Sequence, residues 1–139
     1  MHPHGENKRL VARFLNELAD APADAIQRVL ERYCADETLW EVFHPFNQLQ
    51  GNGAVGSRFW QPLKMALPDY EPRIDILIAG EYEGADWVSV RGHIAGSFFQ
   101  PWIGIPPTYG LTYLRFGLNV TVRNGKITRA YVLLDVLDV

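Results

Sequence analysis

Three side chains in this sequence are candidates for acid–base chemistry: His44, Tyr131 and Asp135. An imidazole that titrates near neutral pH in apolar surroundings could remove a proton α to a carbonyl group. The Asp135 carboxylate could orient that imidazole or act as the base itself, and the Tyr131 hydroxyl could donate a hydrogen bond to the enolate. The alternative is structural: His44 caps a loop, Asp135 pairs with Arg129 or a backbone amide, and Tyr131 belongs to the core.

The expected position of Tyr131 and Asp135 depends on a predicted hairpin near the end of the chain. Asn124-Gly125 is a strong signal for a two-residue turn between strands. Counting outward gives the pairs Arg123–Lys126, Val122–Ile127, Leu118–Tyr131, Phe116–Leu133 and Leu114–Asp135. Because side chains alternate strictly along a strand, Arg129, Tyr131 and Asp135 are expected on the covered, mostly apolar face. A carboxylate there needs a partner or has a perturbed pKa.

Aromatic side chains are expected to line a pocket for a flat, apolar or aromatic ligand. Trp40 and Phe46 share a predicted strand face with His44, whereas Trp102 lies in a Pro/Gly-rich loop and is explained as a pocket lid or a dimer contact. Aromatic residues at these spacings are also typical of an ordinary core. The predicted substrate-binding residues are Trp40, Phe46, Asn47, Trp60, Trp102, Tyr109, Phe116, Leu118 and Arg129.

The elements that must position these residues follow an α+β pattern in one domain, residues 1–139. Periodicity of apolar residues distinguishes helices from strands. The predicted helices span Asn7–Leu18, Pro22 to about Cys34 and a segment after Gly51-Asn52-Gly53, and the predicted strands span Thr38–Phe46 and four segments from Tyr70 onward. Pro62 must end or kink the third helix, because proline has no N–H to donate and clashes with the preceding turn.

Composition excludes several classes of function. The net charge is −3 and basic residues form no stripe, which argues against nucleic-acid binding. No apolar run approaches the roughly 20 residues that span a membrane. The single cysteine, Cys34, fits a reducing cytoplasm and is expected to be a small buried residue rather than a nucleophile. The sequence has no metal-ligand spacing, phosphate-binding loop or nucleophile elbow, so no metal or cofactor is expected.

Several motifs together resemble the SnoaL-like branch of the nuclear transport factor 2 (NTF2)-like superfamily. They are His44-Pro45-Phe46-Asn47, Phe59-Trp60-Gln61-Pro62-Leu63, Leu67-Pro68-Asp69, Gly92 to Gly96, Gly104-Ile105-Pro106-Pro107-Thr108, Asn124-Gly125-Lys126-Ile127 and Asp135. The resemblance implies a curved antiparallel sheet wrapped round a long helix as a cone with an apolar pocket, usually as a homodimer. Founding members of the branch are polyketide cyclases, which close a ring by intramolecular aldol condensation without metal or cofactor.

Two positions depart from the cyclase pattern. The cyclases carry a pocket Asp where this chain has Leu118, and a pocket His where it has Ile94. His93 lies one residue earlier, and an offset of one residue turns a side chain to the other face of the sheet.

The leading hypothesis is therefore a cytoplasmic, cofactor-free enzyme that performs proton transfer on a hydrophobic carbonyl or polyketide-like substrate. One alternative is a non-catalytic module that binds a small molecule in the same pocket. A third is a dimeric interaction protein whose interior is filled by its own side chains. A homodimer through the sheet is the expected assembly in each case.

Overall fold

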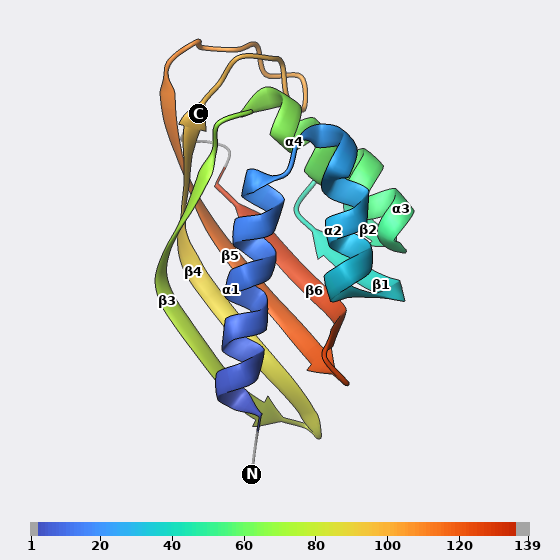
Figure 1. Ribbon diagram of the computed structural model, residues 1–139. Helices are drawn as coiled ribbons and strands as arrows, with labels where there is room; N and C mark the ends of the chain where they lie inside the picture. The colour runs from blue at the N-terminus through green and yellow to red at the C-terminus, as the bar shows by residue number, and fades with distance from the viewer. Residues whose placement is uncertain (1–2, 136–139) are drawn as a thin grey trace.

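The computed structural model describes residues 3–135, and its helices cover one face of a six-stranded sheet (Figure 1). The helical elements are α1 (His4–Asp20), the 3-10 turn η1 (Ala23–Ala25), α2 (Ile26–Tyr33), α3 (Asn52–Val55), the π-helical turn η2 (Gly56–Trp60) and α4 (Gln61–Ala66). The strands are β1 (Cys34–Val42), β2 (Asn47–Gln50), β3 (Glu71–Tyr82), β4 (Ala85–Ser97), β5 (Leu111–Arg123) and β6 (Lys126–Leu134). The predicted α+β architecture is confirmed.

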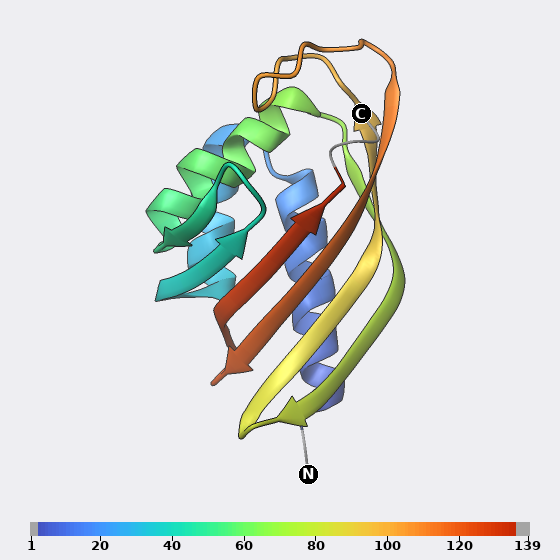
Figure 2. The same cartoon turned by 180° about the vertical axis from the view of Figure 1, so that it is seen from behind.

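The sheet has the strand order β2-β1-β6-β5-β4-β3 and curves round α1. Its neighbouring strands are antiparallel except for β1 and β6, which run parallel, so the sheet is mixed rather than antiparallel throughout. Seen from behind, the other face is covered by no helix of residues 3–135 (Figure 2). The sheet therefore has an inner face toward the helices and an outer face without a covering layer.

The core forms because α1 carries a continuous apolar stripe. Val11, Phe14, Leu15 and Leu18 recur at helical spacing, and none is more than 5% exposed. The Phe14 ring lies 6.2 Å from Trp40 of β1, which is fully buried. This stripe faces the apolar residues of the inner sheet face and fixes α1 across the strands.

The first strand ends earlier than the predicted Thr38–Phe46. Strand β1 ends at Val42, and a turn containing the cis peptide His44–Pro45 leads into β2. Proline cannot continue a paired strand, since it has no N–H to donate. The chain therefore reverses, and Asn47 pairs back with Val42.

The third predicted helix is one continuous helical segment with a π-helical turn in its middle. The Gln61 N–H donates to the Gly56 carbonyl five residues earlier, directly before Pro62. This turn holds one residue more than an α-helical turn would, so two consecutive side chains, Phe59 and Trp60, are both buried. The helix does not end at Pro62, because α4 continues to Ala66; the irregularity is the π-helical turn directly before the proline, and this turn directs two aromatic rings inward.

The last hairpin begins as predicted and then departs from the predicted register. Asn124 and Gly125 both have positive φ, 53° and 74°, as a type I′ turn requires. Beyond Ile127 the strand contains an extra residue, Thr128, so Thr121 pairs with Arg129. Such a bulge moves every later side chain to the opposite face. Ala130, Val132 and Leu134 therefore face inward, and Arg129, Tyr131, Leu133 and Asp135 face outward, contrary to the prediction.

Two glycines in the central strands allow a test of this packing. A Cβ at Gly92 would lie 2.0 Å from the Arg73 carbonyl oxygen, whereas one at Gly117 would lie at least 3.5 Å from its nearest neighbours. We expect Gly92→Ala to lower the free energy of unfolding by about 1–3 kcal/mol or more. Gly117→Ala should be neutral or stabilise by up to about 1 kcal/mol.

Urea denaturation of the two variants measures this difference. Equal losses of stability would mean that the register between β3, β4 and β5 is not the one described.

Candidate functional site

The structure does not assemble the predicted acid–base site. Asp135 follows β6 on the outer face, where its backbone N–H donates to the Arg115 carbonyl at 2.9 Å. Its carboxylate forms an ion pair with the Arg115 guanidinium. The predicted inward position of Asp135 is wrong, because the bulge at Thr128 reverses the alternation, and the carboxylate has a structural partner on the surface.

Tyr131 and Arg129 also lie on the outer face. The Tyr131 ring stacks on Trp87 with 6.0 Å between ring centroids, and the Arg129 guanidinium lies 5.3 Å from the Tyr131 ring. Arg129 pairs with Glu41 of β1 at 3.5 Å. These contacts link the side chains across three strands, and they give Tyr131 and Arg129 no access to the interior.

His44 is exposed in the turn between β1 and β2. The expected strand face shared with Trp40 is wrong, because the turn begins at Phe43 and reorients the chain. Within residues 3–135, His44 makes no hydrogen bond or ion pair, and Asn47 beside the same turn is exposed as well. Neither side chain reaches the buried interior from this position.

The interior instead holds a small apolar cavity between α1, the η2–α4 segment and the inner sheet face. Its walls are Leu15, Phe59, Trp60, Leu63, Tyr70, Pro72, Ile94, Phe116, Leu118, Val132 and Leu134. The centre of a water molecule could occupy about 10 Å³ of this cavity. The cavity therefore has room for about one water molecule. Three residues of the predicted binding set, Trp60, Phe116 and Leu118, line this cavity and nearly fill it.

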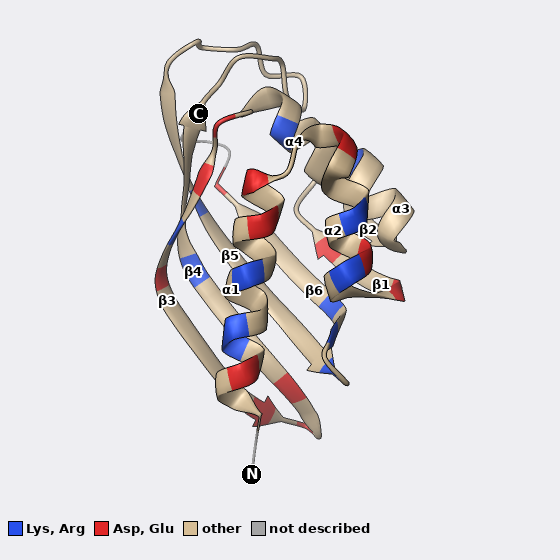
Figure 3. Cartoon of the chain, in the orientation of Figure 1, with Lys and Arg blue, Asp and Glu red and all other residues tan. Residues whose placement is uncertain are grey.

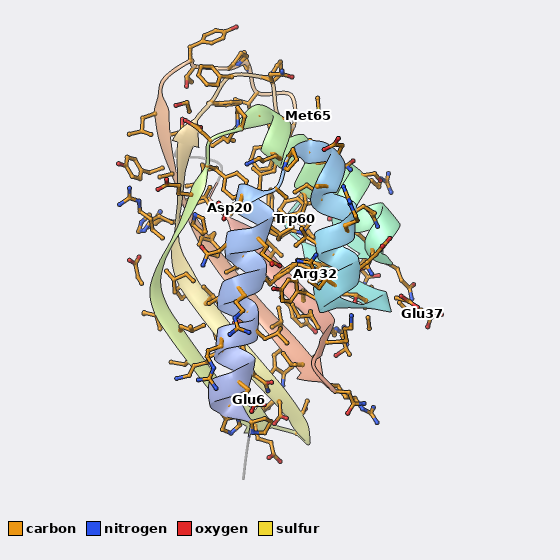
Figure 4. The ribbon with its side chains drawn as sticks, in the orientation of Figure 1. Glu6, Asp20, Arg32, Glu37, Trp60 and Met65 are labelled. Atoms are coloured by element: carbon orange, nitrogen blue, oxygen red, sulfur yellow. The ribbon has the colours of Figure 1, made fainter. Side chains whose placement is uncertain are left out.

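Two of the lining side chains carry polar atoms, and both are hydrogen-bond donors. Trp60, labelled in Figure 4, is 4% exposed, and its indole N–H has no acceptor among residues 3–135. Tyr70 is also 4% exposed, and burial raises the pKa of its hydroxyl, which therefore stays protonated. A buried donor without an acceptor costs stability, so a ligand oxygen here would remove an existing penalty.

A buried lysine lies behind Tyr70. The Lys64 ammonium donates to the Ala19 carbonyl at the end of α1 and lies 5.2 Å from the centre of the Tyr70 ring. Burial lowers the pKa of Lys64, while the carboxylates of Asp20 and Asp69 act in the opposite direction. Sequence reasoning missed both Tyr70 and Lys64. A lysine on an amphipathic helix is ordinarily exposed, and no local pattern marks this one as buried.

Of the remaining aromatic residues in the predicted set, Trp40, Phe46 and Trp102 contact other aromatic rings beside the cavity, and Tyr109 lies on the surface. Trp40 is fully buried with its ring 5.8 Å from Trp60, and Trp102 is 3% exposed with its ring 6.1 Å from Phe43. Phe46 is half-buried and lies 6.5 Å from Trp102 in the same cluster. Tyr109 is 70% exposed. Trp40, Phe46 and Trp102 therefore support the cavity walls without lining the cavity.

Charged residues are spread over helices and strands without a basic stripe, and the loop between β4 and β5 carries none of them (Figure 3). Residues 3–135 contain no cluster of three or more His, Cys, Asp or Glu side chains arranged for a metal ion. Within the same range, no helix is both long and apolar enough to cross a membrane.

Comparison with known proteins identifies the fold. No family model matches this sequence, and no curated protein matches it. A candidate SnoaL-like polyketide cyclase from Jannaschia sp. CCS1 superimposes with a TM-score of 0.81 at 19% identity, over 99% of this chain and 90% of its own. The candidate polyketide cyclase IdmH from Streptomyces antibioticus gives 0.72 at 16% identity, covering 94% and 92%.

A third similar structure is SalBIII, an epoxide hydrolase/cyclase-like enzyme with a role in pyran ring formation in the polyether salinomycin. It superimposes with a TM-score of 0.72 at 18% identity, over 96% of this chain and 94% of its own. At these identities the comparison shows that the chain has the SnoaL-like, NTF2-like fold.

The single cysteine has a predictable effect on stability at high pH. Burial raises the pKa of the Cys34 thiol from an ordinary value of 9.0 to about 12, so the native protein keeps this proton after the unfolded chain has lost it. This contribution to stability is present below about pH 9 and is lost as the pH rises toward 12. Between pH 8 and pH 10, the free energy of unfolding of wild type should fall by about 1.4 kcal/mol more than that of Cys34→Ala.

Urea denaturation at the two pH values measures this difference. If the free energies of unfolding of wild type and Cys34→Ala depend identically on pH, the thiol ionises as readily in the folded protein as in the unfolded chain.

Proposed function

We propose that this protein, which has the fold of the SnoaL-like polyketide cyclases, takes a hydrophobic carbonyl compound into its interior and promotes cofactor-free proton transfer on it. The observation that carries the proposal is an apolar cavity lined by Trp60, whose buried indole N–H has no acceptor within residues 3–135, and by Tyr70, whose hydroxyl keeps its proton because burial raises its pKa. A carbonyl oxygen is an acceptor that both could bind. Apolar walls suit the hydrocarbon part of such a ligand.

The same donors favour an enolate over the ketone. Removing a proton α to a carbonyl places negative charge on the oxygen, and fixed donors in a dry site stabilise that charge strongly. Lys64 is not a lining residue, but its side-chain nitrogen lies 5.2 Å from the centre of the Tyr70 ring and supports that ring from outside the cavity. The lining side chains include no carboxylate or imidazole, so the proton acceptor comes from the substrate or from water.

A ligand enters only if side chains move, because the cavity holds about one water molecule. Phe59 and Trp60 are carried by the π-helical turn η2, and such turns are frequent at functional sites. An outward shift of this turn would enlarge the cavity without breaking the sheet. The apparent Kd for a ligand then equals the intrinsic Kd divided by the fraction of molecules in the open state.

A second candidate function is an interaction protein that dimerises through the sheet. The near-filled cavity favours it, since Trp60, Phe116 and Leu118 occupy the space that a ligand needs. Large apolar side chains on the outer face also favour it, because Ile78 is 59% exposed and Leu133 is 61% exposed. The occupant of that face in this reading is a second copy of the chain.

The enzyme proposal is tested with 2-tetralone, a flat ketone with exchangeable α protons, and with 2-tetralol as the control without a carbonyl group. In D₂O at neutral pH, wild type should accelerate deuterium exchange at the α carbon, as followed by NMR. Trp60→Phe and Tyr70→Phe should each slow the catalysed exchange at least about tenfold, the loss of one hydrogen bond. Trp40→Phe removes a buried indole outside the lining and should retain most of the activity.

Each result assigns a function. Binding of 2-tetralone, seen as a thermal shift, without accelerated exchange would make the protein a binding module. An absence of both, together with a dimer in light scattering, would overturn the proposal in favour of the interaction protein.

A further inference from the structure

A glycine in the middle of the sheet lies beneath the side chain of a neighbouring arginine. Gly117 lies in β5, where it pairs with Arg91 of β4 and Leu133 of β6. Glycine weakens a strand, because it loses more backbone freedom on folding and leaves no side chain to pack. At Gly92 the close approach of a neighbouring carbonyl explains the glycine, but at Gly117 an added Cβ would meet only ordinary contacts with Arg91.

The missing side chain leaves an open hollow on the outer face. It has a volume of about 340 Å³ and is bordered by Arg91, Arg115, Leu133 and Asp135, with β5 as its floor. Phe116 and Leu134 also border the hollow and line the inner cavity as well, so the two spaces lie back to back on opposite faces of the sheet. A central glycine of this kind often marks a place where a ligand approaches the backbone closely.

The hollow has an excess of positive charge. The Arg115 guanidinium is matched by the Asp135 carboxylate. Arg91 is exposed, and its side chain lies against Gly117 and forms no hydrogen bond or ion pair within residues 3–135. On the neighbouring strand β3, the Asp75 carboxylate lies 3.1 Å from His93 Nδ1. Asp75 is therefore paired with His93 and not with Arg91. One guanidinium thus remains available for an anion.

The rim of the hollow is apolar on the side of β6. Leu133 borders the hollow there and is 61% exposed. A hydrocarbon group lying over Gly117 would contact Leu133 and remove apolar surface from water. A bare phosphate ion would use the guanidinium and leave Leu133 exposed.

We propose that this hollow binds a small amphipathic acid, with its carboxylate on Arg91 and its hydrocarbon chain over Gly117 against Leu133. The guanidinium binds the carboxylate through charge-assisted hydrogen bonds, and the absent side chain at Gly117 provides the depth for the chain. This site is independent of the carbonyl chemistry proposed for the interior.

The test uses hexanoate as the probe at millimolar concentration, with the ¹⁵N-labelled protein observed by NMR. Hexanoate should shift the amide signals of Gly117 and its neighbours in β4 and β6, whereas hexan-1-ol should not. Binding should also weaken as the pH falls through the pKa of the acid, roughly 4–5 for a carboxyl group. Arg91→Gln should raise the Kd at least about tenfold.

Two further variants separate the site from general effects. Gly117→Val fills the hollow and should abolish binding, while a urea titration should show stability no lower than that of wild type. Arg123→Gln removes an exposed arginine at the far end of β5 and should leave the Kd unchanged. Equal loss of affinity in Arg91→Gln and Arg123→Gln would overturn the proposal, since it would indicate a diffuse charge effect.

Other outcomes also decide the matter. Inorganic phosphate binding as tightly as hexanoate would overturn the apolar half of the site. A dimer in light scattering that Gly117→Val converts to a monomer would assign the hollow to a second copy of the chain instead. Hexanoate shifts confined to the inner-face residues would place the acid in the interior cavity.

Discussion

A single extra residue in β6 determines which side chains the interior contains. Thr128 is accommodated opposite Thr121, and the two hydroxyls share a hydrogen bond of 2.7 Å that fixes the bulge in place. Without this extra residue, the side chains that follow the Asn124-Gly125 turn would alternate strictly, and charged groups of β6 would face the helices. Burial of an unpaired charge there is costly. With the extra residue, Ala130, Val132 and Leu134 face the helices.

The two faces of the sheet consequently differ in their electrostatics. The inner face encloses apolar groups and the donors of Trp60 and Tyr70, while ion pairs and free charges lie on the outer face. In surroundings of low polarity a hydrogen bond to a developing oxyanion is worth more than in water. The proposed chemistry therefore depends on hydrogen bonds to a substrate oxygen and not on an ionised acid or base among the lining residues.

The sequence was sufficient for most of the elements but not for β2 or for the site. Helical periodicity located the core stripe of α1 and the Asn-Gly pair located the turn at Asn124-Gly125, because each is a local property of the chain. The predicted site failed because one assumption, strict alternation, was carried across a bulge. A signal was present: Thr128 and Arg129 are two consecutive polar residues between the inward-facing Ile127 and Ala130.

Burial of Lys64 and Tyr70 could not be predicted in that way, since it depends on where the end of α1 meets α4 and the loop before β3. The Lys64 ammonium is held by the Ala19 carbonyl, a contact over 45 residues of sequence. Such tertiary contacts leave no periodic trace in the chain. The same limit applies to the unpaired indole of Trp60, whose missing acceptor is visible only in the packed interior.

The parallel pairing of β1 with β6 has a consequence for the order in which the chain can fold. Cys34 pairs with Ile127, and the Lys126 ammonium donates to the Arg32 carbonyl at 2.7 Å, so the early helices dock on the last strand. Contacts between residues so distant in sequence carry a large loop-closure entropy and form slowly. During synthesis on the ribosome, the edge of β1 that pairs with β6 stays unpaired until residues 126–132 have emerged. The protection of this edge from aggregation then depends on how quickly β6 is made and pairs with it.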